Sequence, residues 1–208
     1  MSGASYVIDE SARSQDADIW FVLPPGFIPL PLLELTAAER EPVQTEGPLI
    51  GLGPVLRLAR LLVEAGTVHC CLGLHADDEG DGSPVLSLVM LAWRGTDWAP
   101  RSVLAARAAA GTESAEHIEF LDLPCGPAAL VQTRLTAPPE LGLGAPCELL
   151  QITAYAPCPD GRRMAILQLA TASVARARHY RALLTDIADS VSFENPLPCV
   201  SDDVPDKE

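Results

Sequence analysis

One short segment of the chain carries the residue types that most often bind a metal ion. His69, Cys71 and His75 alternate along a predicted strand, and Asp77 follows them. Alternate residues of a strand project from the same face, and imidazole and thiolate groups are good zinc ligands. However, His69 and His75 are six residues apart, which is about 20 Å along an extended strand. Since one ion cannot reach both without a sharp bend, we expect a half-exposed strand face and no metal site.

Two further histidines lie near carboxylates. His117 follows Glu116 and precedes Glu119, and His179 precedes Asp186 on a predicted helix. A carboxylate beside an imidazole is the usual arrangement of a general acid or base. Neither histidine has an evident nucleophile near it in sequence, so we predict that both are surface residues.

The common motifs for nucleophilic catalysis and phosphate binding are missing from the sequence. No Gly-x-Ser-x-Gly is present, and the nearest segment, Gly111–Ala115, lacks the final glycine. Neither a Walker A motif nor Gly-x-Gly-x-x-Gly after a strand occurs. Gly51–Pro54 precedes a predicted helix whose first amides could hold an anion, but it reads better as a tight loop into that helix. We therefore expect no catalytic residue, no cofactor, no metal and no enzymatic activity.

The cysteines do not form a recognisable pattern. Cys70 and Cys71 are adjacent, so their side chains should point to opposite faces of a strand, and the sequence contains no Cys-x-x-Cys. The remaining four are Cys125, Cys147, Cys158 and Cys199. We predict free thiols, as is usual for a cytoplasmic protein.

Composition narrows the classes of partner. The 208 residues include 48% hydrophobic residues, which is enough for a substantial core. The formal net charge is −14 at pH 7, which disfavours nucleic acid and anionic membranes and favours a basic protein partner. Lys207 is the only lysine, and this arginine bias is typical of a GC-rich genome such as that of an actinobacterium. The first residues do not resemble a secretory signal and no apolar run is long enough to span a membrane, so we expect a cytoplasmic protein.

Hydrophobic periodicity predicts one domain over residues 18–194, between a disordered tail at 1–17 and an acidic disordered tail at 195–208. The predicted strands alternate or are continuously apolar and are bounded by turn residues, whereas the last helix has apolar residues on one face. The predicted strands are 18–23, 67–76, 84–93, 116–123, 128–135, 148–156 and 164–171, and the predicted helices are a short one from Thr36, then 54–65, 100–110 and 174–191.

The segment after the first predicted strand is rich in proline and aromatic residues. Proline excludes a central strand, so this segment is either a strand exit that packs Phe27 on the core or a docking segment. The residues we single out as a possible protein contact are Trp20, Phe21, Pro25, Phe27 and Pro29.

Four segments resemble the Mog1/PsbP-like family of α/β/α sandwich proteins. They are Leu23-Pro24-Pro25-Gly26-Phe27, Leu123-Pro124-Cys125-Gly126, Pro159-Asp160-Gly161, and the end of the last helix from Ile187 to Phe193. The resemblance covers residues 18–194. It implies an α/β/α sandwich and an accessory, binding or assembly role, and it carries over no catalytic residue because the family has no shared catalytic motif.

The sequence therefore predicts an α+β fold, a mainly antiparallel β-sheet covered by helices. We expect a non-enzymatic binding, adaptor or chaperone-like protein that acts through a protein–protein surface. The alternatives are a subunit of a bacterial secretion system or another large apparatus, and a hydrolase that uses His69 or His117 in a site scattered along the sequence. A shallow exposed apolar surface would favour the non-enzymatic binding protein over the hydrolase, which needs a deep pocket.

Overall fold

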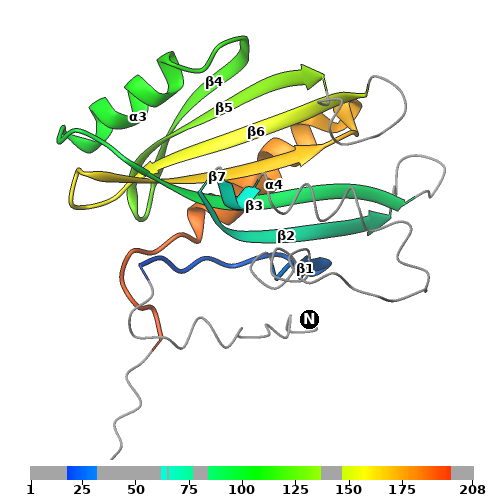
Figure 1. The fold of residues 1–208 in the computed structure, drawn as a ribbon, viewed down its shortest axis with the longest axis horizontal. Helices are drawn as coiled ribbons and strands as arrows, with labels where there is room; N and C mark the ends of the chain where they lie inside the picture. The colour runs from blue at the N-terminus through cyan, green and yellow to red at the C-terminus, as the bar shows by residue number, and fades with distance from the viewer. Residues whose placement is uncertain (1–17, 32–61, 65, 77–83, 137–146, 198–208) are drawn as a thin grey trace, which may run out of the picture.

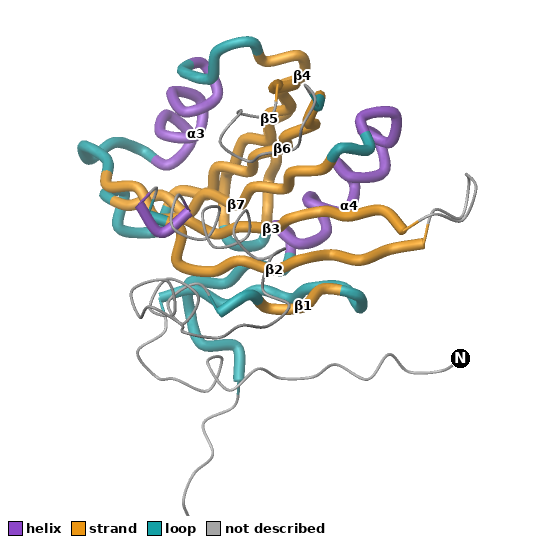
Figure 2. Tube along the Cα trace, turned by 45° about the vertical axis from the view of Figure 1, so that its right-hand side comes forward, coloured by secondary structure: helices purple, strands orange, loops and turns teal. Residues whose placement is uncertain are grey.

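The computed structural model describes residues 18–31, 62–64, 66–76, 84–136 and 147–197. They form one seven-stranded antiparallel sheet in the order β1-β2-β3-β7-β6-β5-β4. Figures 1 and 2 show two helices, α3 and α4, on opposite sides of this sheet. The elements are β1 (Phe27–Pro29), β2 (Thr67–Ala76), β3 (Pro84–Gly95), α3 (Arg101–Ala110), β4 (Ala115–Leu123), β5 (Gly126–Thr136), β6 (Glu148–Pro157), β7 (Arg163–Thr171), the short 3-10 helix η4 (Val174–Arg176) and α4 (Ala177–Asp189).

The prediction of an α+β sandwich was wrong. Of the described residues, 49% lie in strands and 22% in helices, so the fold is β-rich. The helices are too short to cover the sheet, because α3 packs on β5 and β6 and α4 packs on β6 and β7. The two helices predicted earlier in the chain, from Thr36 and over 54–65, lie outside the described residues except for a helical turn at 62–64.

Most strands that follow one another in the sequence pair as neighbours. β2 pairs with β3, and the sequence between them, 77–83, is rich in acidic residues. β4, β5, β6 and β7 form a meander of antiparallel neighbours. β3 lies between β2 and β7, which agrees with its nearly continuous apolar sequence. The predicted strand at 18–23 is wrong: this segment forms only an isolated bridge between Trp20 and Ser192.

The main hydrophobic core lies on the side of the sheet covered by α4, which we call the α4 face. Buried residues of five strands, β3 to β7, form this core with α4, including Leu130, Ile152 and Leu167. Tyr180 and Leu184 face this core because they are four residues apart on the helix. The helix ends where the Ser190 hydroxyl donates a hydrogen bond to the carbonyl of Ile187.

The opposite side, the α3 face, has a smaller core. Leu104, Ala105 and Ala109 of α3 pack there with Val131 and the aromatic ring of Tyr155. Alternation along each strand separates the two cores, since neighbouring residues such as Leu130 and Val131 contribute to opposite faces. The small helix α3 packs mainly on β5 and β6, and within the described chain only the helical turn at 62–64 packs on β2 and β3 on this side, through Leu62 and Val63 beside Cys70 and Met90.

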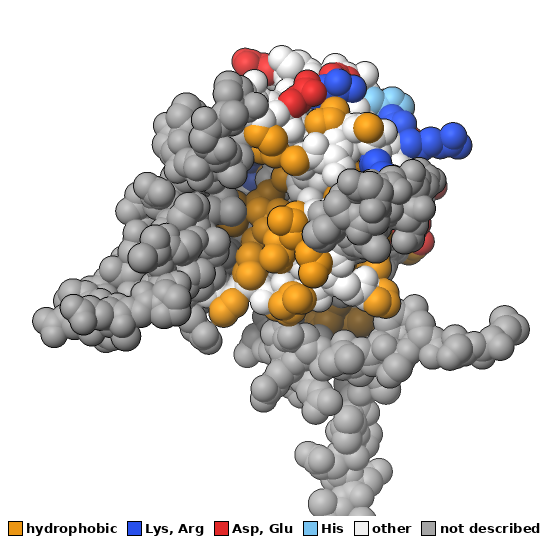
Figure 3. Space-filling view, turned by 90° about the vertical axis from the view of Figure 1, so that its right-hand side faces the viewer, with side chains coloured by type: hydrophobic (Ala, Val, Ile, Leu, Met, Phe, Trp, Pro, Cys, Tyr) orange, Lys and Arg blue, Asp and Glu red, His pale blue; other side chains and the backbone are white. Residues whose placement is uncertain are grey.

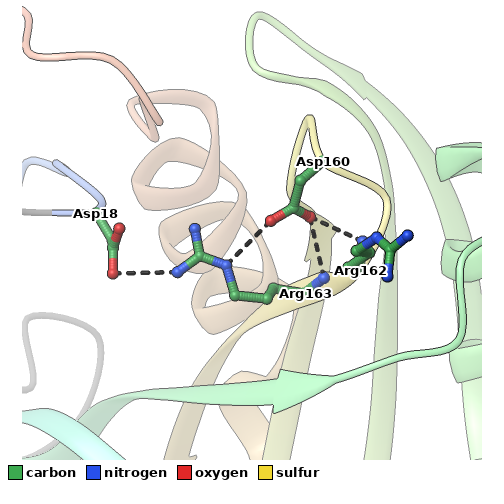
Figure 4. Close-up of polar contacts among 4 residues, drawn as sticks. All are labelled: Asp18, Asp160, Arg162 and Arg163. Carbon is green, nitrogen blue, oxygen red and sulfur yellow. Dashed lines mark hydrogen bonds and ion pairs between the residues drawn. The ribbon is translucent and has the colours of Figure 1, made fainter.

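A polar network fixes the hairpin between β6 and β7. The carboxylate of Asp160 accepts the backbone N–H groups of Arg162 and Arg163 at 2.8 and 3.1 Å, and also pairs with the Arg163 side chain (Figure 4). Gly161, at φ +63°, occupies the turn position that needs a left-handed residue. Pro159-Asp160-Gly161 thus forms the turn that joins the antiparallel strands β6 and β7.

Candidate functional site

The structure brings together two of the predicted metal-ligand candidates, His69 and Cys71, on the α4 face of β2. The sulfur of Cys71 is 3.1 Å from Nε2 of His69, and the Phe21 ring lies edge-on to the imidazole at 5.4 Å between centroids. Cys71 is 0% exposed. A catalytic cysteine needs access to its substrate, so this pair contributes to the packing of the core and does not form an open nucleophilic site.

Metal binding at the same strand lacks a third ligand in the part of the chain that the structure describes. No group of three histidine, cysteine or acidic side chains is close enough there to hold an ion. The side chain of His75 and the whole of Asp77 lie outside the described residues. The absence of a metal site therefore stays a prediction.

The other two candidate histidines are placed at the surface. His117 Nε2 lies 3.6 Å from a carboxylate oxygen of Glu119, and both side chains are about half exposed. Glu116 is engaged elsewhere, because it accepts a hydrogen bond from Gln132. His179 is exposed and its ring stacks edge-on with that of Tyr180. The prediction that His117 and His179 are surface residues is confirmed.

Ser114 is the serine nearest to a nucleophile motif. It is exposed and has φ +57°, a backbone conformation that non-glycine residues rarely adopt. It joins α3 to β4, whereas a nucleophile elbow joins a strand to a following helix. The geometry gives this serine the role of a turn residue.

The described cysteines are free thiols, as predicted, and Cys199 lies outside the described residues. Burial raises the pKa of Cys70 to about 12, with a further contribution from Cys71. Burial also raises the pKa of Cys158 to about 11 and raises that of Cys125. These three thiols stay neutral near pH 7, which does not suit a nucleophile.

The aromatic residues of the predicted contact segment are used mainly for folding. Trp20 is buried, and its backbone N–H and C=O groups pair with Ser192 at 2.8 and 2.9 Å. Phe21 and Phe27 pack against the core on the α4 face. Asp18, at the start of this segment, forms an ion pair with Arg163 at 3.1 Å (Figure 4).

The prolines of the same segment remain at the surface. Pro25 and Pro29 are exposed. Ile28, which precedes Pro29 in the edge strand β1, is 57% exposed. The structure therefore separates the five predicted contact residues into an aromatic set that is buried or partly buried and an exposed proline pair.

A larger apolar surface lies on the α3 face, where β2 and β3 pair. Leu72 is directly opposite Leu88, and Leu74 is directly opposite Leu86. We call these four residues the leucine patch. Leu74 is 52% exposed and Leu86 is 54% exposed. Figure 3 views the molecule from the side where β2 ends and β3 begins, and it shows hydrophobic side chains gathered between the residues drawn in grey.

Polar side chains border the leucine patch on the side of β7 and β6, the next strands of the sheet after β3. Gln168 of β7 and Gln151 of β6 each donate a side-chain N–H to the hydroxyl of Thr153, both at 3.4 Å. Both glutamines are only partly buried. Amide side chains have two donors and an acceptor, so each can also bind a peptide group. The α3 face thus presents an apolar area beside a row of amides.

Sequence reasoning missed this patch. The alternation of Leu72 and Leu74 in β2 was visible, but we expected helices to cover both faces of the sheet. Exposure depends on where α3 packs, and that position is set by contacts with β5 and β6 far along the chain. The acidic connection between Leu74 and Leu86 was the one local signal that this end of the hairpin meets solvent.

Comparison with known proteins does not assign the chain to a family. No protein-family model matches it, and no curated protein has a significantly similar sequence. The resemblance to Mog1/PsbP-like proteins is therefore without support from related sequences and stays a prediction. Within the described part of the chain, no helix is both long and apolar enough to cross a membrane.

Proposed function

We propose that this protein is a non-enzymatic binding protein that holds a segment of another protein on the α3 face of its sheet. The observation that carries the proposal is the leucine patch, in which Leu74 and Leu86 are both more than half exposed on a strand pair that α3 does not reach. Exposed apolar side chains that are contiguous mark interaction sites more often than isolated ones do.

The neighbouring residues indicate the chemistry of the partner. Apolar side chains would cover the leucines, while Gln151 and Gln168 would hydrogen-bond peptide groups at the border on the side of β7 and β6. The net charge of −14 and the acidic residues Asp77, Asp78, Glu79 and Asp81 in the connecting sequence favour a partner with basic flanks. The partner we propose is an apolar segment flanked by arginine or lysine.

The size of the effect follows from the exposed leucines. Complete burial of a leucine side chain contributes about 1.5–3 kcal/mol, so covering two half-exposed leucines contributes about 2 kcal/mol. Replacing both by serine should therefore weaken binding by about 30-fold. Because both side chains are exposed, the same change should have little effect on folding.

The test is a quantitative affinity capture with a matched control. Tagged wild-type protein, the double variant Leu74→Ser/Leu86→Ser and the control Val22→Ser would be compared in extracts of the native cells. Val22 is a suitable control because it is 47% exposed and its backbone N–H bonds the hydroxyl of Ser190 at the end of α4, which covers the opposite face of the sheet. We expect one partner in near-equal amount with wild type and control, and its loss with the double variant.

Two results would refute the proposal. One is capture of the partner by the double variant at the wild-type level, and the other is loss of the partner with the Val22 control alone. Titration of the purified partner into each variant would then give the dissociation constants and show whether flanking basic residues matter.

We also propose that the protein acts in the cytoplasm. Five described cysteines are free, and Cys125 and Cys147 among them are only partly buried. Free thiols at the surface suit a reducing compartment. Fractionation of the native cells, followed by detection of the protein in the cytoplasmic fraction, tests this proposal.

A further inference from the structure

The strand β4 forms one edge of the sheet and has apolar side chains that the described chain does not cover. In the described residues β4 pairs with β5 alone, and α3 packs on β5 and β6. Ile118 and Phe120 lie opposite Val131 and Ala129 and therefore point to the α3 face. They are 44% and 63% exposed, respectively.

The other face of β4 carries a histidine and a glutamate that can pair with each other. His117 and Glu119 are two residues apart on the same side of the strand, and their side chains are 3.6 Å apart. An edge strand in an ordinary monomer usually carries charges or a proline that prevent pairing with another chain. Here the central part of the edge is apolar on one face and has one imidazole and one carboxylate on the other.

We propose that two copies of this chain pair through antiparallel β4 strands, with the two-fold axis at Ile118. In this register Ile118 lies opposite Ile118 of the second copy, and Phe120 lies diagonally across from it. His117 of each copy lies opposite Glu119 of the other, so the contact contains two imidazole–carboxylate pairs.

The neighbouring registers are less favourable. A two-fold axis at Glu119 places this carboxylate directly opposite its own copy, which is repulsive. A two-fold axis at Phe120 places Ile118 opposite the carboxylate of Asp122. The axis at Ile118 places Phe120 opposite Glu116, but that carboxylate is already held by Gln132 and Arg134 of its own chain. The side chains of β4 therefore favour the register centred on Ile118.

The proposed pairing has a geometric consequence for the rest of the molecule. The two-fold axis of an antiparallel edge-to-edge pair is perpendicular to the sheet, so both α3 faces lie on the same side. Each dimer would then present two leucine patches in the same direction. The proposal depends only on β4 and holds whether or not the leucine patch binds a partner.

The decisive experiment is a cross-linking test of the register with the full chain. Ile118→Cys should form an intermolecular disulfide under mild oxidation, because residues directly opposite in antiparallel strands have Cα atoms within disulfide range. Phe120→Cys and the remote control Ile28→Cys should form little covalent dimer, as should the wild type. A cross-link from Phe120→Cys equal to that from Ile118→Cys, or none from Ile118→Cys, would overturn the register.

Sedimentation equilibrium on charge variants tests the contact without cysteine chemistry. His117→Glu alone places two carboxylates opposite each other at both positions and should weaken dimerisation by about tenfold. The exchange His117→Glu/Glu119→His restores the pairs and should restore the wild-type dissociation constant. A wild type that stays monomeric at every concentration, or an exchange variant as weak as the single variant, would overturn the proposal. Since these side chains are exposed, the variants are expected to fold, and circular dichroism would verify it.

Discussion

The substitution Gly126→Ala should destabilise the fold through its effect on Arg101. Gly126 opens β5 with φ +118°, and a Cβ atom there would lie 2.5 Å from Cζ of Arg101. The guanidinium occupies this space because its Nε donates to the carbonyl of Pro157 at 2.9 Å and its Nη2 donates to the carbonyl of Cys125. Its Cζ also lies 5.9 Å from the centre of the Phe193 ring. Arg101 thus connects the start of α3 to two turns and to the C-terminal segment.

The expected cost has two parts. A non-glycine residue at this φ costs about 1–3 kcal/mol. Displacing the guanidinium also removes two hydrogen bonds from a charged donor, and each contributes about 1.5–3 kcal/mol. We therefore expect Gly126→Ala to lower the free energy of unfolding by about 5 kcal/mol in the wild type. In an Arg101→Ala background only the backbone part remains, so the same change should cost about 2 kcal/mol.

The assay is a double-mutant cycle with equilibrium urea denaturation. The four proteins are the wild type, Gly126→Ala, Arg101→Ala and the double variant, and the coupling should be about 3 kcal/mol. Equal costs of Gly126→Ala in both backgrounds would refute the reasoning, because the glycine would then be required by the backbone alone.

Substitutions at three further positions test other parts of the structure. Burial raises the pKa of Cys70 from 9.0 to about 12. The neutral thiol therefore contributes to stability below pH 9, and this contribution is lost as the pH rises toward 12. Between these two pH values the urea midpoint of the wild type should fall, and Cys70→Ala should make that fall smaller. Asp160→Ala should cost about 1 kcal/mol or more in thermal denaturation, because the carboxylate accepts two backbone N–H groups, while Asp160→Asn should cost less since it keeps an acceptor. Trp20→Ala should lower the free energy of unfolding in urea by about 3–5 kcal/mol because the indole is buried. A variant that keeps its stability and only loses a partner would instead make Trp20 a contact residue.

Much of the sheet was predictable because strand alternation and turn chemistry act locally. The hairpin of β2 and β3 and the meander from β4 to β7 follow from alternating apolar residues and from turns such as Pro159-Asp160-Gly161. The fold class was not predictable in the same way. Helical periodicity shows that a helix forms, but how much of a sheet it covers depends on contacts with distant strands.

The edge of the sheet shows the same limit. Pro29 correctly excluded a central strand, and β1 is an edge strand. The segment at Trp20 has the apolar sequence of a strand, yet it pairs with Ser192 at one point only, because its partner lies at the far end of the chain. Local sequence does not encode a pairing across that separation.

For the candidate site, too, some features could be predicted from local sequence and others depend on how the helix α3 packs. The prediction that His117 and His179 lie at the surface needed only their polar neighbours, and it is confirmed. The leucine patch and the apolar part of β4 are exposed because α3 lies over β5 and β6 and not over their neighbours. Residue types identified Leu74 and Phe120 as apolar, and only the packing of the helix identifies them as accessible.

The most direct test of binding through the leucine patch is site-specific photo-crosslinking in native cells. A p-benzoylphenylalanine residue would replace Leu74 in one strain and the similarly exposed Val22, beside the end of α4, in another. We predict one discrete covalent adduct from position 74, of a size that matches the partner captured with the wild-type protein, and no such adduct from position 22. An adduct from position 22 and none from position 74 would contradict the proposal that the α3 face holds the partner.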